Sequence, residues 1–246
     1  AAKVLKEFVF TRPVTLSGGG MFPMGDDMKL MKGRIRFDAS AGRVRYPLLG
    51  TTLDLGKAKG EILISPQWVV VDKMKGTIWD GSFTGRVLAQ IDDGDALNGS
   101  FVLQDMNLTS IGRSYGKKME KATVHGAIEF SSKGGNMNSI QAKGEAALVH
   151  GDLVEIPLFG FLGEALSNYI PGLGHLINYK ITRADCDFSI EKGYIRTSNF
   201  SAKGSNMSLE GGGWIRLADL QVNSDFKLGL RGLPGLITSP VFLLAG

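Results

Sequence analysis

Apolar and polar residues alternate at every second position over much of this chain. One short phrase recurs within that pattern: a basic or small residue, a glycine, and then alternating apolar positions. Alternation with a period of two is typical of a strand with one apolar face and one face in water. A chain that repeats such strands builds a large sheet with one apolar face. The phrase occurs at Lys32–Phe37, Lys59–Ile64, Lys75–Ile78, His125–Phe130, Lys143–Leu148 and, more loosely, Lys203–Leu209.

The alternation predicts a series of short strands joined by tight turns. Glycine supplies 34 of the 246 residues, about double the usual share of ~7%, and we expect these glycines at turns and strand starts. Turns are predicted at Ser17–Gly20, Asp92–Asp95 and Lys133–Asn136. The predicted strands are 8–10, 33–37, 44–55, 60–65, 69–72, 76–79, 82–91, 96–107, 123–131, 140–149, 179–190, 194–201, 206–211, 213–217 and 221–229.

The hydrophobic period changes to helical spacing after Pro157. Proline suits the first turn of a helix, and Pro171–Gly172 ends the pattern. One or two short amphipathic helices are therefore expected near 157–178. Because few polar residues interrupt this stretch, we expect the helix to plug one end of the sheet or to contact a membrane. The residues assigned to that contact are Phe159, Phe161, Leu162, Leu166 and Ile170.

The phase of the alternation selects the residues of the apolar face. Three architectures bury such a face: a two-sheet sandwich, a closed barrel, or a long curved sheet with a helix at one end. A helix of about fourteen residues spans only ~21 Å, so it cannot cover the whole face, and periodicity does not choose among the three. The residues assigned to the face are Val124, Ile128, Phe130, Leu148, Phe188, Ile190, Met207, Leu209, Ile215, Leu217, Phe226 and Leu228.

Charge and candidate chemistry narrow the function classes. The net charge is +4, but the basic residues are scattered singly, which does not favour nucleic-acid binding. The single cysteine, Cys186, is expected as a buried thiol, and it does not identify the compartment. His125, His150 and His175 are 25 residues apart, without cysteine or carboxylate partners at ligand spacing, so neither a metal nor another cofactor is predicted.

Gly112–Gly116 matches the G-x-S-x-G pattern of a hydrolase nucleophile elbow, and Asp152 and His175 follow in the required order. The flanking sequence does not fit, because residues 117–121 are too short and polar for the buried helix that the elbow needs. A loop between strands is the expected structure, with Ser114 carrying no catalysis. The sequence therefore predicts a binding or structural protein rather than an enzyme.

Six segments, in their order along the chain, resemble the AsmA-like family. They are 76–87 (GTIWDGSFTGRV), 96–108 (ALNGSFVLQDMNL), the strand and helix entry from Lys143 to Leu158, the closing strands 184–194 and 207–217, and 232–236 (GLPGL). Together they cover roughly residues 68–246. The chain is thus similar to the C-terminal domain of bridge-like lipid transport proteins of the AsmA, TamB and YhdP type.

The resemblance implies a long curved antiparallel sheet that forms a groove. It implies a non-catalytic protein of the Gram-negative cell envelope that conducts or holds phospholipid acyl chains between the inner and outer membranes. The expected location is the periplasm, with an inner-membrane anchor outside this sequence, and the expected partners are acyl lipid, a membrane surface and other envelope proteins. The alternative is an assembly factor for outer-membrane proteins without lipid cargo. The expected domains are an N-terminal β-repeat segment, 1–65, continuous with the AsmA-like domain, 66–246.

Overall fold

The computed structural model describes residues 9–21, 31–48, 51–91, 96–116, 118, 121–133, 139–151, 181–204, 207–218, 221–230 and 240–244. Fifteen strands and one short helix lie in these residues. The elements are β1 (Val9–Phe10), β2 (Thr15–Met21), β3 (Lys32–Asp38), β4 (Arg43–Leu48), β5 (Thr51–Ile64), β6 (Trp68–Ile78), β7 (Gly81–Gln90), β8 (Leu97–Asn107), α2 (Leu108–Ser114), β9 (Thr123–Ser132), β10 (Gln141–Val149), β11 (Ile181–Glu191), β12 (Tyr194–Gly204), β13 (Met207–Arg216), β14 (Val222–Leu230) and β15 (Pro240–Leu244).

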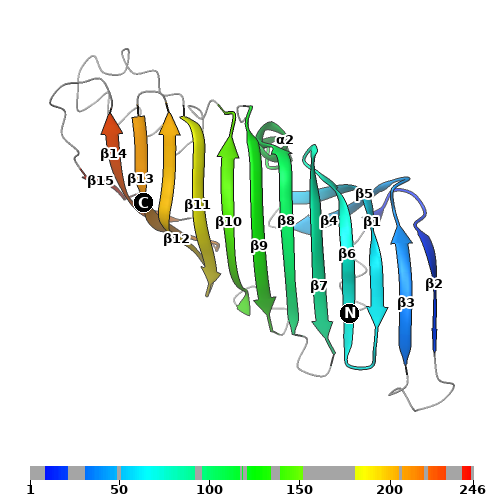
Figure 1. Cartoon of the computed structure of the whole chain (residues 1–246). Helices are drawn as coiled ribbons and strands as arrows, with labels where there is room; N and C mark the ends of the chain where they lie inside the picture. The colour runs from blue at the N-terminus through cyan, green and yellow to red at the C-terminus, as the bar shows by residue number, and fades with distance from the viewer. Residues whose placement is uncertain are drawn as a thin grey trace. The chain divides into compact units, whose positions relative to one another are not determined.

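The strands form one long antiparallel sheet, which is neither closed nor strongly curled (Figure 1). From β4 onward, strands that follow one another in the sequence are neighbours in the sheet, while β2 pairs only with β3 and β3 also pairs with β5. The prediction of a mainly antiparallel β fold is therefore confirmed. The closed barrel, one of the three architectures left open by the sequence, is excluded for the described strands.

The chain divides into two compact units. The N-terminal unit comprises Ala1–Met106 and Ala127–Ala142, and the C-terminal unit comprises Asn107–Gly126 and Lys143–Gly246. The domain boundary expected between residues 65 and 66 comes from the AsmA-like resemblance, and it stays a prediction.

Two devices set the strand register in the N-terminal unit. Trp79 and Asp80 both have positive φ, at 48° and 62°, and they form the two-residue turn between β6 and β7. This backbone twist suits a two-residue hairpin. Lys73, with φ 51°, lies at a register shift between Val71 and Met74, where β6 bulges. The strands predicted at 69–72 and 76–79 are therefore one bulged strand.

Other predictions at the N-terminal end were wrong in detail. Residues 17–20 do not turn but run inside β2, paired with β3. Gly18 and Gly20 allow this pairing, because a Cβ there would lie 2.2 Å from the Arg34 carbonyl oxygen and 2.3 Å from that of Lys32. The single strand predicted at 44–55 is the hairpin of β4 and β5, paired from Arg43↔Gly56 to Leu48↔Thr51.

The C-terminal unit contains an antiparallel series from β11 to β14 (Figure 1). The β11–β12 turn is again a left-handed pair, Lys192 at φ 52° and Gly193 at φ 77°. Gly211–Gly213 lie inside β13, opposite a register shift in β12 between Thr197 and Phe200. The sequence had placed a break there, so the strands predicted at 206–211 and 213–217 are one strand.

The described helix, α2, is one that the sequence analysis missed. Asn107 caps it, its side chain accepting a hydrogen bond of 2.9 Å from the Thr109 N–H. Gly116, at φ 65°, follows it and donates to the Arg113 carbonyl. The amphipathic helices predicted near 157–178 lie outside the described residues. Among the described residues, none forms a helix long and apolar enough to cross a membrane.

Candidate binding surface

Phenylalanine rings lying over glycines form the apolar face of the N-terminal unit. Phe37 pairs with Gly60, Phe83 with Gly76, and Phe101 with Gly85. A Cβ on each glycine would lie 2.8 Å from Phe37 Cε1, 2.8 Å from Phe83 Cε1 and 2.4 Å from Phe101 Cδ1. The glycine thus provides the space that the ring of the neighbouring strand occupies, as in aromatic rescue of strand glycines.

The rings also contact one another across the strands. Phe83 and Phe101 lie with centroids 6.5 Å apart, and Phe101 stacks on Phe130 at 6.0 Å with an interplanar angle of 3°. Phe130 in turn lies over Gly99, where a Cβ would be 2.5 Å from its Cζ. The expectation that glycines occupy turns and strand starts is therefore wrong for these positions. Gly60 and Gly76, which belong to the recurring phrase, lie inside strands, and each leaves space for an aromatic ring of the neighbouring strand.

The C-terminal unit has an equivalent apolar face. Ala184, Ala202, Leu209 and Leu228 lie in one row across β11–β14, because each pairs with the next. Phe226 lies over Gly211, and its ring meets that of Phe200 edge-on at 5.5 Å. A further row at the strand ends runs through Ile190, Ile195, Ile215 and Val222.

Most side chains on these two faces are half-buried, but Ala184, Ala202, Leu209 and Phe226 of the C-terminal unit are buried, with exposed fractions of 8%, 0%, 1% and 6%. Of the large side chains that the structure describes, Leu209 alone is more than 98% buried, and Ile215 on the same face is 37% exposed. In the N-terminal unit, Phe83 is buried near the β6–β7 turn, whereas Phe101 on the next strand is half-buried. A second layer packed over the whole face would bury such residues almost completely. The described residues thus present apolar surface beyond what they cover themselves.

The predicted face residues lie on five strands. The structure brings Leu209 opposite Leu228, and Ile190 and Ile215 into one row with Ile195 between them. Leu217 lies in the turn after β13, and the helix residues Phe159, Phe161, Leu162, Leu166 and Ile170 are outside the described part. The others lie on β9 (Val124, Ile128, Phe130), β10 (Leu148), β11 (Phe188), β13 (Met207) and β14 (Phe226). Phe130 of the N-terminal unit was predicted, but Phe37, Phe83 and Phe101 were not, although the Lys-Gly phrase contains two of the glycines beneath them, Gly60 and Gly76.

The opposite face of the N-terminal unit is charged and centred on Glu61. Its carboxylate accepts from Arg36 Nε at 3.2 Å and Lys73 Nζ at 3.4 Å, and Arg34 Nε lies at 4.0 Å. Burial raises the pKa of Glu61, but the Arg36 hydrogen bond and the charges of Lys73 and Arg34 lower it by more, so its pKa lies below the ordinary value. Arg86 and Asp72 form a further pair at 3.5 Å.

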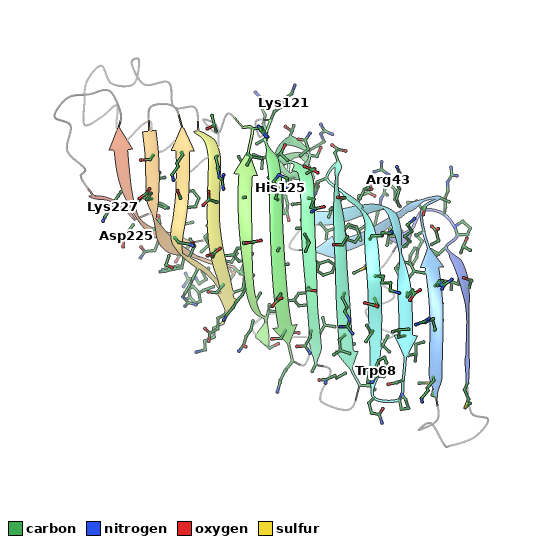
Figure 2. The ribbon with its side chains drawn as sticks, in the orientation of Figure 1. Arg43, Trp68, Lys121, His125, Asp225 and Lys227 are labelled. Atoms are coloured by element: carbon green, nitrogen blue, oxygen red, sulfur yellow. The ribbon has the colours of Figure 1, made fainter. Side chains whose placement is uncertain are left out.

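The opposite face of the C-terminal unit is also charged. Asp225 and Lys227 alternate with Ser224 and Phe226 along β14, and Figure 2 shows both charged side chains on that strand. Arg196 lies 4.8 Å from the centroid of Tyr194, whose ring meets Trp214 at 5.3 Å. In each unit, therefore, one face is mainly apolar and the other carries the charged side chains, although Leu63, Val70 and Leu88 form an apolar row across the charged face of the N-terminal unit.

Cys186 lies on the apolar face of β11, in phase with Ala184 and Phe188. Burial and the neighbouring Asp187 and Asp185 carboxylates raise the pKa of its thiol, against a hydrogen bond from Thr197 that lowers it. A raised pKa leaves little thiolate at neutral pH, so this half-buried cysteine is a poor nucleophile.

Of the candidate catalytic and metal residues, Asp152 and His175 lie outside the described residues, while Ser114, His125 and His150 lie within them. Ser114 lies in the last turn of α2, where its Oγ donates to the Ser110 carbonyl at 3.0 Å. The sharp strand-to-helix turn of a nucleophile elbow requires the serine before a helix, not at its end. The loop predicted at Gly112–Gly116 is instead this helix end. Within the described part of the chain, no three His, Cys, Asp or Glu side chains are grouped to hold a metal ion.

Comparison of the chain with protein-family models, with curated proteins and with solved structures finds no match. The candidate surface therefore rests on the residues and their geometry.

Proposed function

We propose that this protein is a non-catalytic lipid-binding protein whose apolar sheet face holds acyl chains. The observation that carries the proposal is the half-exposed apolar face opposite a charged one, present in both units. Contiguous exposed apolar surface on a folded protein usually marks a binding site. Acyl chains are long, flexible and apolar, so they can lie along rows of aliphatic side chains without specific polar contacts.

The energetics favour such a ligand. Each methylene group removed from water contributes ~0.8 kcal/mol, so ten methylenes laid on the face give a gross gain of about 8 kcal/mol before the cost of ordering the chain. Headgroups stay in water at the strand ends. The rings of Phe37 over Gly60 and Phe101 over Gly85 are half-buried, so they add apolar surface on which acyl chains can lie.

The finer parts of the proposal come from the AsmA-like resemblance. They are a sheet curved into a groove, a helix near 157–178 that closes one end, a periplasmic location with an anchor outside this sequence, and transfer of phospholipid between the inner and outer membranes. These parts have their own test, because a groove protein extracts and delivers phospholipid between vesicles, whereas a protein that only stores lipid retains it.

A role in assembly of outer-membrane proteins is the second candidate, and one observation favours it. β2 is exposed along its whole length and pairs only with β3 among the described strands. An unpaired edge can add a strand from another chain. This candidate predicts binding of extended peptides without bound lipid.

Cys186 offers a direct test, because it is the only cysteine and lies on the apolar face. We expect short-chain phospholipid to slow its alkylation by a maleimide. The matched control carries Cys186→Ser and Ser201→Cys; Ser201 pairs with Asp185 and therefore lies on the polar face. Slowing at Cys186 but not at position 201 supports the proposal. Equal rates with and without lipid at Cys186 contradict it.

A further inference from the structure

The polar face of β3 and β5–β7 in the N-terminal unit carries an excess of positive charge that the polar face of β11–β14 in the C-terminal unit lacks. On β3, β6, β7 and residues 59–64 of β5, the face of Glu61 carries seven basic side chains (Lys32, Arg34, Arg36, Lys59, Lys73, Lys75 and Arg86) and three acidic ones (Asp38, Glu61 and Asp72). The polar face of β11–β14 carries five basic and five acidic side chains. Each unit as a whole has a net charge of +2, with 15 basic and 13 acidic residues in the N-terminal unit and 13 and 11 in the C-terminal unit. The difference therefore lies between the polar faces of these strands and not between the whole units.

The basic groups are also the outermost ones. The side chains of Arg34, Arg36, Lys73 and Arg86 are 61–70% exposed, while that of Glu61 beneath them is 13% exposed. One carboxylate is therefore shared among three cations, and it lies below them. What this face presents to solvent is predominantly cationic.

Two further lysines, Lys32 and Lys75, add charge that nearby carboxylates do not balance. Lys75 lies directly opposite Lys59 in the β5–β6 register, an unfavourable like-charge pair. Lys59 does have Asp38 opposite it on β3, and its charge helps to lower the pKa of Asp38 after the hydrogen bonds from Ser40. Neither Lys75 nor Lys32 takes part in an ion pair with a described residue. An anion above this face relieves the repulsion.

The arrangement fits a flat anionic surface. Neighbouring strands are ~4.8 Å apart and alternate residues ~6.7 Å apart, and the sheet is not strongly curled, so the cations form a shallow two-dimensional array. Single-stranded nucleic acid needs aromatic side chains between the cations for base stacking. On this face, the described residues of β3 and β5–β7 include one aromatic side chain, that of Trp68, which lies at the start of β6 and is labelled in Figure 2. An indole at a rim suits the headgroup region of a bilayer.

We propose that the polar face of the N-terminal unit docks on an anionic lipid bilayer, leaving the opposite, apolar face free. This inference is independent of the acyl-chain proposal, because it rests on the other face. Each basic residue near an anionic membrane surface contributes about fivefold in affinity.

The test is sedimentation of the protein with sucrose-loaded vesicles of phosphatidylcholine, alone or with roughly one-third phosphatidylglycerol. We expect binding to the anionic vesicles, lost between about 0.05 M and about 0.5 M NaCl as the charges are screened. Lys32→Gln with Lys75→Gln weakens it by about 25-fold. The matched control, Lys203→Gln with Lys227→Gln, removes the same charge from the polar face of the C-terminal unit and weakens binding less than about threefold.

Urea unfolding of both variants checks the fold, and the first variant is expected to be no less stable than the parent because it removes the Lys59–Lys75 repulsion. Equal binding to neutral and anionic vesicles overturns the proposal. So does an equal loss in the two double variants, which indicates net charge alone. Tighter binding to a single-stranded oligonucleotide than to anionic vesicles assigns the face to nucleic acid instead. Failure of lipid to protect Cys186 leaves this result unaffected, so the two proposals fail separately.

Discussion

A methyl group on Gly85 tests whether the phenylalanine rings depend on the glycines beneath them. Gly85 pairs with Phe101, and a Cβ there would lie 2.4 Å from Phe101 Cδ1, 2.7 Å from Cε1 and 2.8 Å from the Ser100 carbonyl oxygen. The ring has to move in Gly85→Ala. Because Phe101 stacks on Phe130 and tilts against Phe83, its displacement disturbs both contacts.

The expected cost follows from these contacts. Inserting a methyl group into a packed site costs roughly 1–3 kcal/mol, and each aromatic pair contributes ~0.5–1.5 kcal/mol beyond its buried area. We expect Gly85→Ala to lower the free energy of unfolding by about 2–3 kcal/mol. For a chain of this length that corresponds to a fall of roughly 5–10 °C in Tm.

Urea unfolding followed by circular dichroism measures the loss, and Gly19→Ala is the matched control. Gly19 is also a strand glycine, but a Cβ there meets nothing within 4 Å, so this substitution is expected to be neutral or to stabilise by up to ~1 kcal/mol. In a Phe101→Ala background, Gly85→Ala is expected to lose the part of its cost that comes from the ring, while the close approach to the Ser100 carbonyl oxygen remains. Equal effects of the two glycine substitutions would refute the reasoning.

Three further predictions follow from single residues. The pKa of folded Glu61 lies below its ordinary value, so its contribution to stability is complete above that ordinary value and is lost as the pH falls through the folded pKa. Glu61→Gln should therefore reduce the loss of unfolding free energy at acid pH, measured by urea unfolding at several pH values. An unchanged loss in this variant would contradict the ion pairs of Glu61 with Arg36 and Lys73. Gly193 has φ 77°, so Gly193→Ala should cost about 1–2 kcal/mol in urea unfolding, whereas no cost would count against the left-handed turn. Since burial and two carboxylates raise the pKa of Cys186, its alkylation at neutral pH should be slower than that of free cysteine, and Asp187→Asn should accelerate it; a rate equal to that of free cysteine would show that the thiol is not shielded.

The strands could be predicted from the sequence because alternation is a local signal. β7 to β12 and β14 lie close to their predicted bounds, and the charged residues Asp225 and Lys227 lie out of phase with the predicted face residue Phe226. The errors arose where glycine or a bulge interrupts the pattern. Gly18 and Gly20 suggested a turn, yet they lie in β2 because the carbonyls of β3 approach too closely for a side chain.

Long-range pairing explains the features that the sequence could not reveal. The role of Gly60 depends on Phe37, 23 positions earlier, and that of Gly99 on Phe130, so neither is visible in a local window. The helix α2 has only seven residues, too few for a helical period to stand out, although the Asn107 cap and Gly116 mark its ends. The cluster on Glu61 joins three strands and likewise requires the register.

The central claim is that the apolar face holds acyl chains. The most direct test is to extract lipid from the purified protein and to identify it by mass spectrometry. The account predicts co-purifying phospholipid, and a reduced amount in Ile215→Asp, which charges an exposed position on that face, with no reduction in Lys227→Asp on the opposite face. A lipid-free protein that is folded, or equal lipid content in the two variants, would contradict it.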